Sequence, residues 1–302
     1  MKAMILAAGL GTRLLPFTLM KPKPLFPVLN IPLVHLTISR IRKSGFTTII
    51  INAHHLRHQI KEALQHEANC ILQEEETILG TGGGLRKAMP HFDDKPLLVV
   101  NGDIYHTINY QDVYSEHCAS KADVTLVLHD YPRFNNVAVD ERLMITGFKK
   151  TDNACGQKGK LLAFTGIHVI NPKILQNIPP ETPCCIVECY EKILAQGGTI
   201  RARLVEDHYW TDMGTPEDYL QLHADLLKQK IPVYEELDKM ILDAPFTGLK
   251  NASISDAAKL IDWACIGKGA VIGDDVTIKR SVVWDDAVIP AGCIIQDAIV
   301  TD

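Results

Sequence analysis

The sequence predicts an α/β fold followed by a short left-handed parallel β-helix. Its first part alternates short β-branched runs with amphipathic helical stretches, an order typical of a mainly parallel sheet covered by helices. Its last part places an aliphatic residue at every sixth position, which is the repeat of a parallel β-helix. We therefore expect domains at 1–228 and 253–302, joined by a segment, 229–252, that contains Pro232, Pro245 and Gly248.

Five apolar runs are the strand candidates of the first domain. The run Leu97–Val100 is apolar at every position, as expected of a central strand that is covered on both faces. Helical periodicity marks Pro32–Ser44 and Leu56–His66. The predicted strands are Ala3–Ala7, Thr48–Asn52, Leu97–Val100, Val124–Leu128 and Ile167–Ile170.

The six-residue repeat of the last domain is regular enough to predict its inward positions. Three hexads make one triangular coil, so we expect about two to three coils. Aliphatic residues stand at Ile254, Leu260, Ile266, Ile272 and Ile278 and, after a slip of one residue, at Val283, Ile289 and Ile295.

Composition and charge exclude several classes of protein. The chain has 302 residues, of which 46% are hydrophobic and 22% charged, and its net charge is −5. This balance gives no electrostatic reason to expect a nucleic-acid partner. No apolar run reaches the ~18 residues that a membrane span needs. The apolar start breaks at Gly9 without a cleavage site, so we expect a first strand, not a signal peptide, and a cytoplasmic protein.

Two clusters of metal-binding residue types do not have the pattern of a metal site. Among the eight cysteines, Cys184, Cys185 and Cys189 lack paired C-x-x-C spacing, so we expect reduced thiols. The group of His54, His55 and His58 has no carboxylate to complete it and is typical of a solvated helix start.

A glycine-rich loop directly after the first predicted strand indicates phosphate binding. Gly9 and Gly11 allow backbone N–H groups to approach phosphate oxygens, and ligands bind at the carboxyl ends of parallel strands. A dinucleotide-binding fingerprint would need a third glycine at Leu14, and a Walker A loop would need Gly-Lys-Ser/Thr. Neither is present. The loop residues Ala8, Gly9, Gly11 and Thr12 are the candidate phosphate contacts.

The continuation of this loop carries a family resemblance. From Gly9 to Val28 the chain reads G-x-G-T-R-L-x-P-x-T-x-x-x-P-K-P-L-x-P-V, which resembles the sugar-nucleotide pyrophosphorylases. The resemblance covers at least residues 1–225 and implies a Rossmann-like nucleotidyltransferase domain with a mixed, mainly parallel sheet. It also implies a reaction in which a nucleoside triphosphate and a sugar 1-phosphate give a nucleotide-sugar, a cell-wall or polysaccharide precursor, and pyrophosphate.

The resemblance assigns catalytic roles to two cations. Arg13 offers a planar fork of donors that can hold the β- and γ-phosphates as they leave. Lys23, between two prolines, can neutralise charge around the α-phosphate. Without the surrounding motif both would be interpreted as surface cations.

Two aspartates complete the expected chemistry as Mg²⁺ ligands. Asp103 follows the strand Leu97–Val100, and Asp212 stands in a segment similar to the family's W-x-D-x-G-T-P element. They lie 109 residues apart, so only the resemblance brings them together. A sugar 1-phosphate oxygen would then attack the α-phosphorus in line, and no general base is needed because that oxygen is already anionic.

The residues expected to select the base favour two different nucleotides. The segment with Gly80, Gly82 and Gly83 has a T-G-G-G form most like N-acetylmuramate 1-phosphate uridylyltransferases, while its Gly80-Thr81 is shared with mannose-1-phosphate guanylyltransferases. Glu75, at the base-reading position, accepts hydrogen bonds only, which suits guanine. We expect UTP with N-acetylmuramate 1-phosphate or a related hexose 1-phosphate, with GTP and mannose 1-phosphate as the alternative.

The sugar-binding residues are less well marked. The family's Glu-Lys-Pro element is replaced by a segment with Lys149 and Lys150, either of which could hold the sugar phosphate. Thr165 and Gly166 stand on a strand that resembles the family's sugar-pocket strand.

Two further readings of the chain remain to be weighed. A non-catalytic nucleotide-sugar sensor would be expected to have lost a phosphate or metal residue, and an acyltransferase would need more coils.

We also expect Trp284 to be exposed, and the tail to pack on the first domain or on a second subunit, giving a homodimer.

Overall fold

The computed structural model describes residues 1–149 and 159–301, so the predicted sugar-phosphate ligand Lys150 lies outside the described residues. Contacts divide the chain into two compact units, each made of several segments. Unit 1 comprises Met1–Leu10, Ile38–Gly102 and Ile108–His208, and unit 2 comprises Gly11–Thr37, Asp103–Thr107 and Tyr209–Asp302. The predicted boundaries at 228 and 252 stay a prediction. Within the described ranges, every helix is too short or too polar to span a lipid bilayer.

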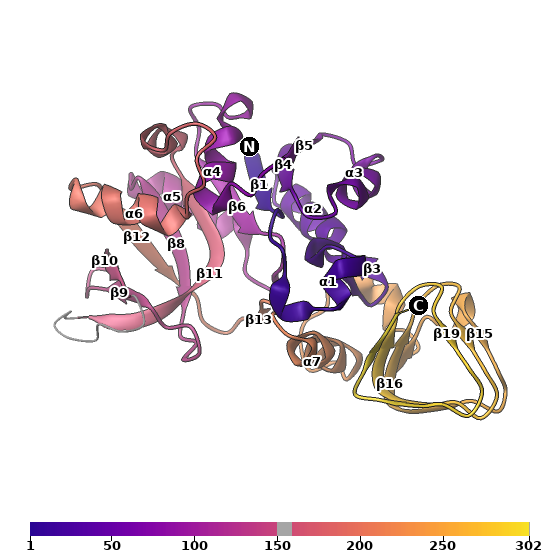
Figure 1. Cartoon of the computed structure of the whole chain (residues 1–302). Coiled ribbons are helices and arrows are strands. Elements are labelled where there is room, and N and C mark those ends of the chain that lie inside the picture. The colour runs from indigo at the N-terminus through magenta and orange to yellow at the C-terminus, as the bar shows by residue number, and fades with distance from the viewer. Residues whose placement is uncertain (150–158, 302) are drawn as a thin grey trace. The chain divides into compact units, whose positions relative to one another are not determined.

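Unit 1 is built on a nine-stranded mixed sheet (Figure 1). Its central strand β1 (Lys2–Leu6) lies parallel to β4 (Thr48–Ala53) on one side and to β6 (Leu97–Asn101) on the other. β5 (Cys70–Glu74) extends the sheet beside β4. Beyond β6 the long strand β11 (Lys160–Ile170) runs antiparallel, and it pairs in turn with β8 and β9. The remaining strands are β8 (Val124–His129), β9 (Val137–Val139), β10 (Ile145–Phe148) and β12 (Ile200–Leu204).

The expected mixed α/β fold is therefore confirmed, and each predicted strand is present within one or two residues at its ends, except that the fifth forms the end of β11. The predicted helices correspond to α2 (Leu33–Lys43) and α3 (Arg57–Leu64). The core of unit 1 includes the buried side chains of Met4 on β1, Val99 on β6 and Leu126 on β8. Further helices are α4 (Gly80–Lys87), α5 (Tyr110–Ser120) and α6 (Ile186–Ala195), with 3₁₀ turns at Met89–His91 and Pro172–Asn177.

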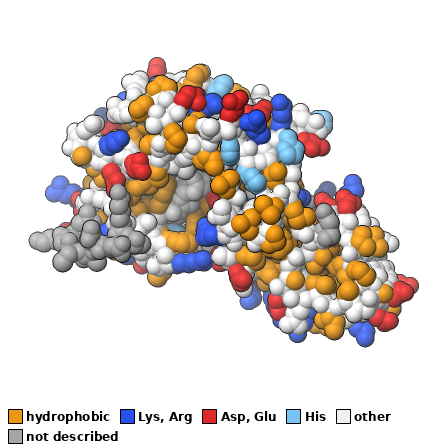
Figure 2. All heavy atoms as spheres, in the orientation of Figure 1, with side chains coloured by type: hydrophobic (Ala, Val, Ile, Leu, Met, Phe, Trp, Pro, Cys, Tyr) orange, Lys and Arg blue, Asp and Glu red, His pale blue; other side chains and the backbone are white. Residues whose placement is uncertain are grey.

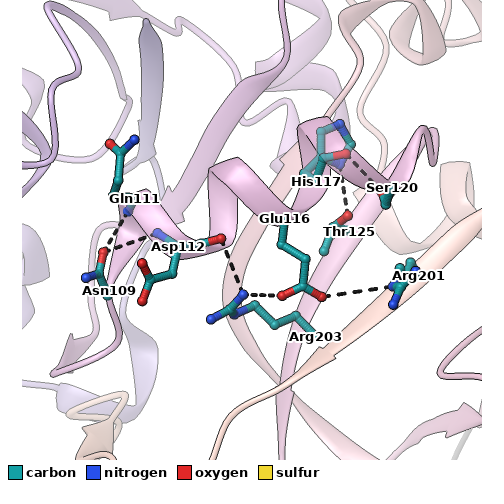
Figure 3. Close-up of polar contacts among 9 residues, drawn as sticks. All are labelled: Asn109, Gln111, Asp112, Glu116, His117, Ser120, Thr125, Arg201 and Arg203. Atoms are coloured by element: carbon teal, nitrogen blue, oxygen red, sulfur yellow. Dashed lines mark hydrogen bonds and ion pairs between the residues drawn. The ribbon is translucent and has the colours of Figure 1, made fainter.

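Helix α5 is fixed at its start by a cap and along its side by ion pairs (Figure 3). The side chain of Asn109 accepts from the backbone N–H groups of Gln111 and Asp112, which have no partner inside the helix. Glu116 forms ion pairs with Arg203 and, at 4.0 Å, with Arg201, both on β12. The two arginines share one face of the strand because they are two residues apart.

Unit 2 contains short N-terminal elements and one longer helix, α7 (Pro216–Leu227). A hairpin of β2 (Pro27–Val28) and β3 (Ile31–Pro32) turns at Leu29 and Asn30, both with positive φ. His223 on α7 fastens this turn, because its Nε2 accepts from the backbone N–H of Leu29 at 3.2 Å. The other N-terminal elements are the 3₁₀ turns Thr12–Leu14 and Lys23–Leu25 and α1 (Phe17–Met20). Two later segments of unit 2 form the antiparallel strand pair β7 (Tyr105–His106) and β13 (Trp210–Thr211).

The C-terminal part of unit 2 consists of short strands stacked in parallel. In β16 (Lys259–Ile266), Lys259 pairs with Thr277 of β18 (Thr277–Val283), 18 residues later, and Thr277 pairs with Ile294, 17 residues later. The slip in the sequence repeat therefore shortens one turn by a single residue. The other strands are β14 (Phe246–Thr247), β15 (Ser253–Ile254), β17 (Val271–Ile272), β19 (Val288–Ile289), β20 (Ile294–Gln296) and β21 (Ile299–Val300), with 3₁₀ turns at Glu235–Met240 and Leu249–Asn251.

All eight repeat positions, from Ile254 to Ile295, lie in one hydrophobic cluster or pack against it. The predicted direction of these side chains is thus confirmed, and the parallel pairing is compatible with the predicted β-helix. One part of the predicted connecting segment joins this stack, because Phe246 of β14 pairs with Ala264 of β16.

The expectation that Trp284 is exposed is wrong. Its side chain is only 4% exposed and lies in the core of unit 2 beside α7. Its ring centroid is 4.9 Å from that of Phe26, and its indole N–H donates to the hydroxyl of Tyr219 at 3.3 Å. Trp284 therefore packs the C-terminal strands on the same chain.

Candidate active site

The phosphate loop leaves β1 with its first residues held in place. Asn52 at the end of β4 accepts from the backbone N–H of Ala7 at 2.8 Å, and Gly9 is exposed, with no atom within 4 Å of the position a Cβ would take. Gly11 has a φ of 63°, and a Cβ there would meet Thr18 Cγ2 at 2.8 Å. Gly9 thus leaves space beside the loop, whereas Gly11 is needed for the turn itself.

The loop continues into an apolar segment that is only partly used by the core. Leu15, Leu19 and Met20 are all more than a third exposed. Figure 2 shows hydrophobic side chains gathered over α1. An exposed apolar group of this kind commonly marks a contact surface.

Lys23 and Asp103 form the first of two cation–acid pairs among the predicted site residues. Lys23 Nζ lies 2.8 Å from Asp103 Oδ2. The lysine side chain is 7% exposed and that of the aspartate 35%. A buried ammonium is costly without an anionic or polar partner, so Asp103 is the group that allows Lys23 to sit here. Lys23, which the sequence predicts to contact the α-phosphate, is therefore paired with a carboxylate in this structure.

Arg13 and Asp212 form the second pair. Arg13 Nη2 lies 3.1 Å from Asp212 Oδ2, and the other carboxylate oxygen accepts from the backbone N–H of Gly214 at 3.2 Å. A Cβ at Gly214 would lie 2.5 Å from Arg13 Nη1 and 2.8 Å from Asp212 Oδ2. A glycine is therefore required beside this pair.

The strand pair β7–β13 places the two acids at one end of a single ladder. Tyr105 pairs with Thr211 in antiparallel register. Asp103 precedes Tyr105 by two residues and Asp212 directly follows Thr211, so both acids leave the ladder at the same end. Residues 109 apart in the sequence are thereby brought together.

The chemistry of this acid pair fits Mg²⁺. Carboxylate oxygens are its preferred protein ligands, and Mg²⁺ is usually held by one or two of them together with substrate phosphates. In residues 1–149 and 159–301, no group of three or more His, Cys, Asp or Glu side chains is placed to hold a metal ion. Two carboxylates alone would leave coordination positions of such an ion open to other oxygen ligands.

Glu75 sits in a different environment from the one its expected role requires. Its side chain is fully buried in unit 1. One carboxylate oxygen accepts from Asn52 Nδ2 at 2.7 Å and from Gln73 Nε2 at 3.4 Å, and the other accepts from the backbone N–H of Leu79 at 3.2 Å. Both oxygens are occupied within the protein, so this geometry favours support of the β5–α4 connection over contact with a base edge.

The glycines Gly80, Gly82 and Gly83 lie inside helix α4. A Cβ at Gly83 would lie 2.5 Å from the carbonyl oxygen of Thr182, and one at Gly80 would lie 2.7 Å from that of Cys184. These glycines therefore let α4 approach the chain before α6. Thr81 helps to fix that chain, because its hydroxyl accepts from the backbone N–H of Ile186.

The expected sugar residues lie on or near β11. Thr165 is buried and its hydroxyl donates to the carbonyl of Val127, so its side chain supports the sheet. Gly166 has a φ of 79° at an irregularity in the β8–β11 pairing, and a Cβ there would meet Asn101 Nδ2 at 2.5 Å. The backbone N–H of Lys149 donates to the carbonyl of Asn136 at 2.7 Å.

Sequence analysis did not single out a histidine pair at the carboxyl end of β8. His129 Nδ1 lies 3.0 Å from His208 Nε2, and the His129 ring stacks on Tyr131. Burial, and secondarily His208, lowers the pKa of His129 to about 4. The signal available in the sequence was a polar residue at the end of the otherwise apolar run Val124–Leu128.

Comparison with protein families adds to this geometry. The sequence profile described as "Nucleotidyl transferase" matches residues 2–229, about three quarters of the chain. A mannose-1-phosphate guanylyltransferase of Mycobacterium tuberculosis is 29% identical over 308 residues, covering 97% of this chain and 82% of the relative. An N-acetylmuramate alpha-1-phosphate uridylyltransferase of Neisseria meningitidis is 32% identical over 185 residues, covering 59% of this chain and 78% of the relative.

Solved structures agree on the fold. A putative glucose-1-phosphate thymidylyltransferase of Bacillus anthracis, in complex with a sucrose, has a TM-score of 0.66 at 19% identity, covering 78% of this chain and 98% of that one. HddC of Yersinia pseudotuberculosis, complexed with GMP-PN, has a TM-score of 0.61 at 22% identity, covering 73% of this chain and 97% of that one. At these identities the likeness concerns the fold alone.

Proposed function

The chain belongs to the nucleotidyl transferase family, and from this premise we propose that it is an enzyme that joins a nucleoside triphosphate to a sugar 1-phosphate. The observation that carries the proposal is the pair of cation–acid contacts, Lys23 with Asp103 and Arg13 with Asp212. A sensor that only binds nucleotide-sugar would not need both acids and both cations. Their joint presence favours turnover.

The mechanism follows from the charges of the reactants. The sugar 1-phosphate oxygen attacks the α-phosphorus, the bond to the β-phosphate oxygen breaks, and pyrophosphate leaves with the electron pair. Asp103 and Asp212 would hold Mg²⁺, which neutralises charge on the phosphates when bound. Lys23 and Arg13 would then be available to phosphate oxygens. Lys23, the more buried cation, would stabilise charge near the α-phosphate, and the exposed Arg13 would bind the departing pyrophosphate.

The remaining predicted residues are assigned to the phosphates, the sugar and the base. Ala8, Gly9, Gly11 and Thr12 would line the phosphates through the backbone, since Gly9 leaves open space. Gly166, whose backbone lies close to Asn101, is assigned to the sugar ahead of Thr165, because the Thr165 hydroxyl is engaged in the sheet. Gly80, Gly82 and Gly83 would shape the base pocket through the position of α4, and Glu75 would do so indirectly.

GTP and mannose 1-phosphate are the first candidate substrates. The mannose-1-phosphate guanylyltransferase relative aligns over 97% of the chain, so its similarity extends into the C-terminal strands. The expected preference for UTP with N-acetylmuramate 1-phosphate is the second candidate. It is favoured by the 32% identity of the uridylyltransferase relative, whose alignment covers 59% of the chain.

Residues 253–302 would form the left-handed parallel β-helix expected from the hexad repeat. The 17- and 18-residue spacing between paired strands, which is about three hexads, supports it. A homodimer remains part of the proposal, with the exposed apolar side chains Val271 and Val288, paired on neighbouring strands, as its candidate surface. Cytoplasmic location and Mg²⁺ dependence stay predictions.

The test is a panel in which each nucleoside triphosphate is combined with each sugar 1-phosphate and pyrophosphate release is measured with Mg²⁺. We expect one combination to exceed all others and to need both substrates. Release in no combination, together with tight binding of a nucleotide-sugar by calorimetry, would instead establish the sensor.

A further inference from the structure

We infer that Tyr234 is a positioning residue for the acid pair Asp103 and Asp212, an inference that rests on the proposed function. Tyr234 lies beyond the part of the chain matched by the family profile, which ends at residue 229. It also lies in the segment that sequence analysis treated as a connection. In the structure its side chain is 9% exposed and belongs to the core of unit 2.

A tyrosine hydroxyl binds the edge of β7 that faces away from β13. Thr107 N–H donates to the carbonyl of Tyr209 at 3.0 Å, on the side of the strand that faces β13. Neighbouring residues of a strand point their backbone groups to opposite edges, so those of His106 face away from β13. There the Tyr234 hydroxyl accepts from His106 N–H at 3.1 Å and donates to His106 C=O at 2.5 Å. One side-chain hydroxyl takes the place of a neighbouring strand.

Ring packing holds this hydroxyl in position. The rings of Tyr234 and Tyr105 are stacked, with centroids 4.2 Å apart and planes at 12°. Tyr105 is itself fully buried, and its hydroxyl donates to the carbonyl of Pro232 at 3.4 Å. Two residues of the segment after α7 thus contact β7 through both ring and backbone.

The hydrogen bonds between Tyr234 and His106 also affect the two acids, because both acids lie next to the β7–β13 strand pair. Asp103 precedes Tyr105 by two residues, and Tyr105 pairs with Thr211, the neighbour of Asp212. A two-residue strand has few ladder bonds to define its position. Loss of the Tyr234 hydroxyl would leave two backbone groups of His106 without this partner and would let β7 shift against β13. Such a shift changes the spacing of Asp103 and Asp212, on which divalent-cation binding depends.

The test is the substitution Tyr234→Phe, which removes the hydroxyl and keeps the ring. We expect the Mg²⁺ concentration for half-maximal turnover to rise by about 10- to 100-fold, as when an outer-shell partner of a metal ligand is removed. The KM for the sugar 1-phosphate should stay within about twofold of the wild-type value. A second readout without turnover is amide hydrogen exchange of the 103–107 peptide, where the His106 amide should exchange faster in the variant.

Tyr114→Phe is the matched control. Tyr114 is likewise buried, and its hydroxyl donates to a backbone carbonyl, that of Pro96, at 3.1 Å, but it lies in unit 1. This variant should leave the Mg²⁺ requirement and the exchange of the 103–107 peptide unchanged.

The outcomes separate this inference from the proposed function. An unchanged Mg²⁺ requirement in an active Tyr234→Phe enzyme would overturn the inference alone, even if His106 exchanged faster. A wild-type protein that turned over no substrate pair would overturn the proposed function, and with it the inference. If Tyr234→Phe did not fold, hydrogen exchange of the wild-type protein would still test the inference. A His106 amide that exchanged as fast as an exposed amide would contradict its hydrogen bond to the Tyr234 hydroxyl.

Discussion

The ammonium group of Lys23 lies 2.8 Å from Asp103 Oδ2, and the lysine is the partner that is shielded from water. A buried cation of this kind needs a counter-charge at all times. Asp103 supplies it in this structure, and phosphate oxygens would supply it in the proposed reaction, where Asp103 would hold Mg²⁺. Arg13 and Asp212 neutralise each other in the same way, but the side chain of Arg13 is more exposed than that of Lys23. The resting site is thus neutralised by the same four groups that the reaction would use.

Replacement of either acid by its amide should lower turnover. Asp103→Asn and Asp212→Asn each remove one proposed ligand while keeping the shape of the side chain. We expect losses on the order of 100- to 1000-fold in kcat, as for removal of one electrostatic contact to developing charge. Near-normal kcat in either variant, with Mg²⁺ as the only divalent cation, would contradict a shared site. Asp297→Asn, at an exposed ion pair with Arg280, is the control and should be as active as the wild type.

A methyl group at position 214 should separate Arg13 from Asp212. Gly214→Ala places a Cβ within 3.0 Å of both side chains, so one of them must move. We expect kcat to fall more than the KM for the sugar 1-phosphate rises, because the proposed partner of Arg13 is the leaving pyrophosphate. Steady-state kinetics of Gly214→Ala beside Arg13→Ala would check this. Effects confined to that KM in both variants would show that Arg13 acts on the sugar phosphate.

Acid should destabilise the fold through buried neutral histidines. Burial lowers the pKa of His223 to about 4, and in its neutral form the Nδ1–H donates to Tyr219 C=O while Nε2 accepts from Leu29 N–H. Burial also lowers the pKa of His168 to about 3. The unfolded chain therefore binds protons from about pH 6.5 downward while the folded chain does not.

The free energy of unfolding should accordingly change little between about pH 7 and pH 8 and fall below about pH 6.5. Each such histidine contributes about 1.4 kcal/mol per pH unit until its folded pKa is reached. Urea unfolding at pH 7.5, 6, 5 and 4.5 measures this, and His223→Gln should reduce the slope. A flat profile between pH 6.5 and 4.5 would contradict buried, neutral histidines.

Trp284 should contribute to stability and not to self-association. Because it packs on Phe26 and Tyr219 of its own chain, Trp284→Ala should cost about 3–5 kcal/mol of unfolding free energy. Its molar mass by light scattering should equal that of the wild type. A change of oligomeric state with little loss of stability would mean that Trp284 instead contacts a second chain. Val288→Ala, at a 61% exposed position of the same strand stack, is the control for stability.

The elements that could be predicted are those determined by local periodicity. The strand at Leu97–Val100 follows from an unbroken apolar run, and the inward positions from Ile254 to Ile295 follow from the hexad repeat. The phosphate loop, Asp103 and Asp212 were found through one long motif and its continuation, because family resemblance supplies the distant contact that spacing cannot.

The remaining features depend on tertiary contacts that no single segment encodes. The buried carboxylate of Glu75 depends on Asn52 and Leu79, and the helical glycines depend on the chain at Thr182 and Cys184. A large aromatic residue such as Trp284 is typical of an exposed contact site, and Trp284 is a core residue here because it packs beside α7. Tyr234 stands in a segment with no periodicity at all.

The account's central claim is that the chain transfers a nucleotidyl group to a sugar 1-phosphate. Phosphorus NMR of the reaction with Mg²⁺, the preferred nucleoside triphosphate and its sugar 1-phosphate tests it most directly. We predict that the triphosphate and sugar-phosphate resonances decline together and that nucleotide-sugar and pyrophosphate appear in equal amounts. Formation of nucleoside diphosphate and inorganic phosphate, or spectra that do not change over an extended incubation, would contradict the claim.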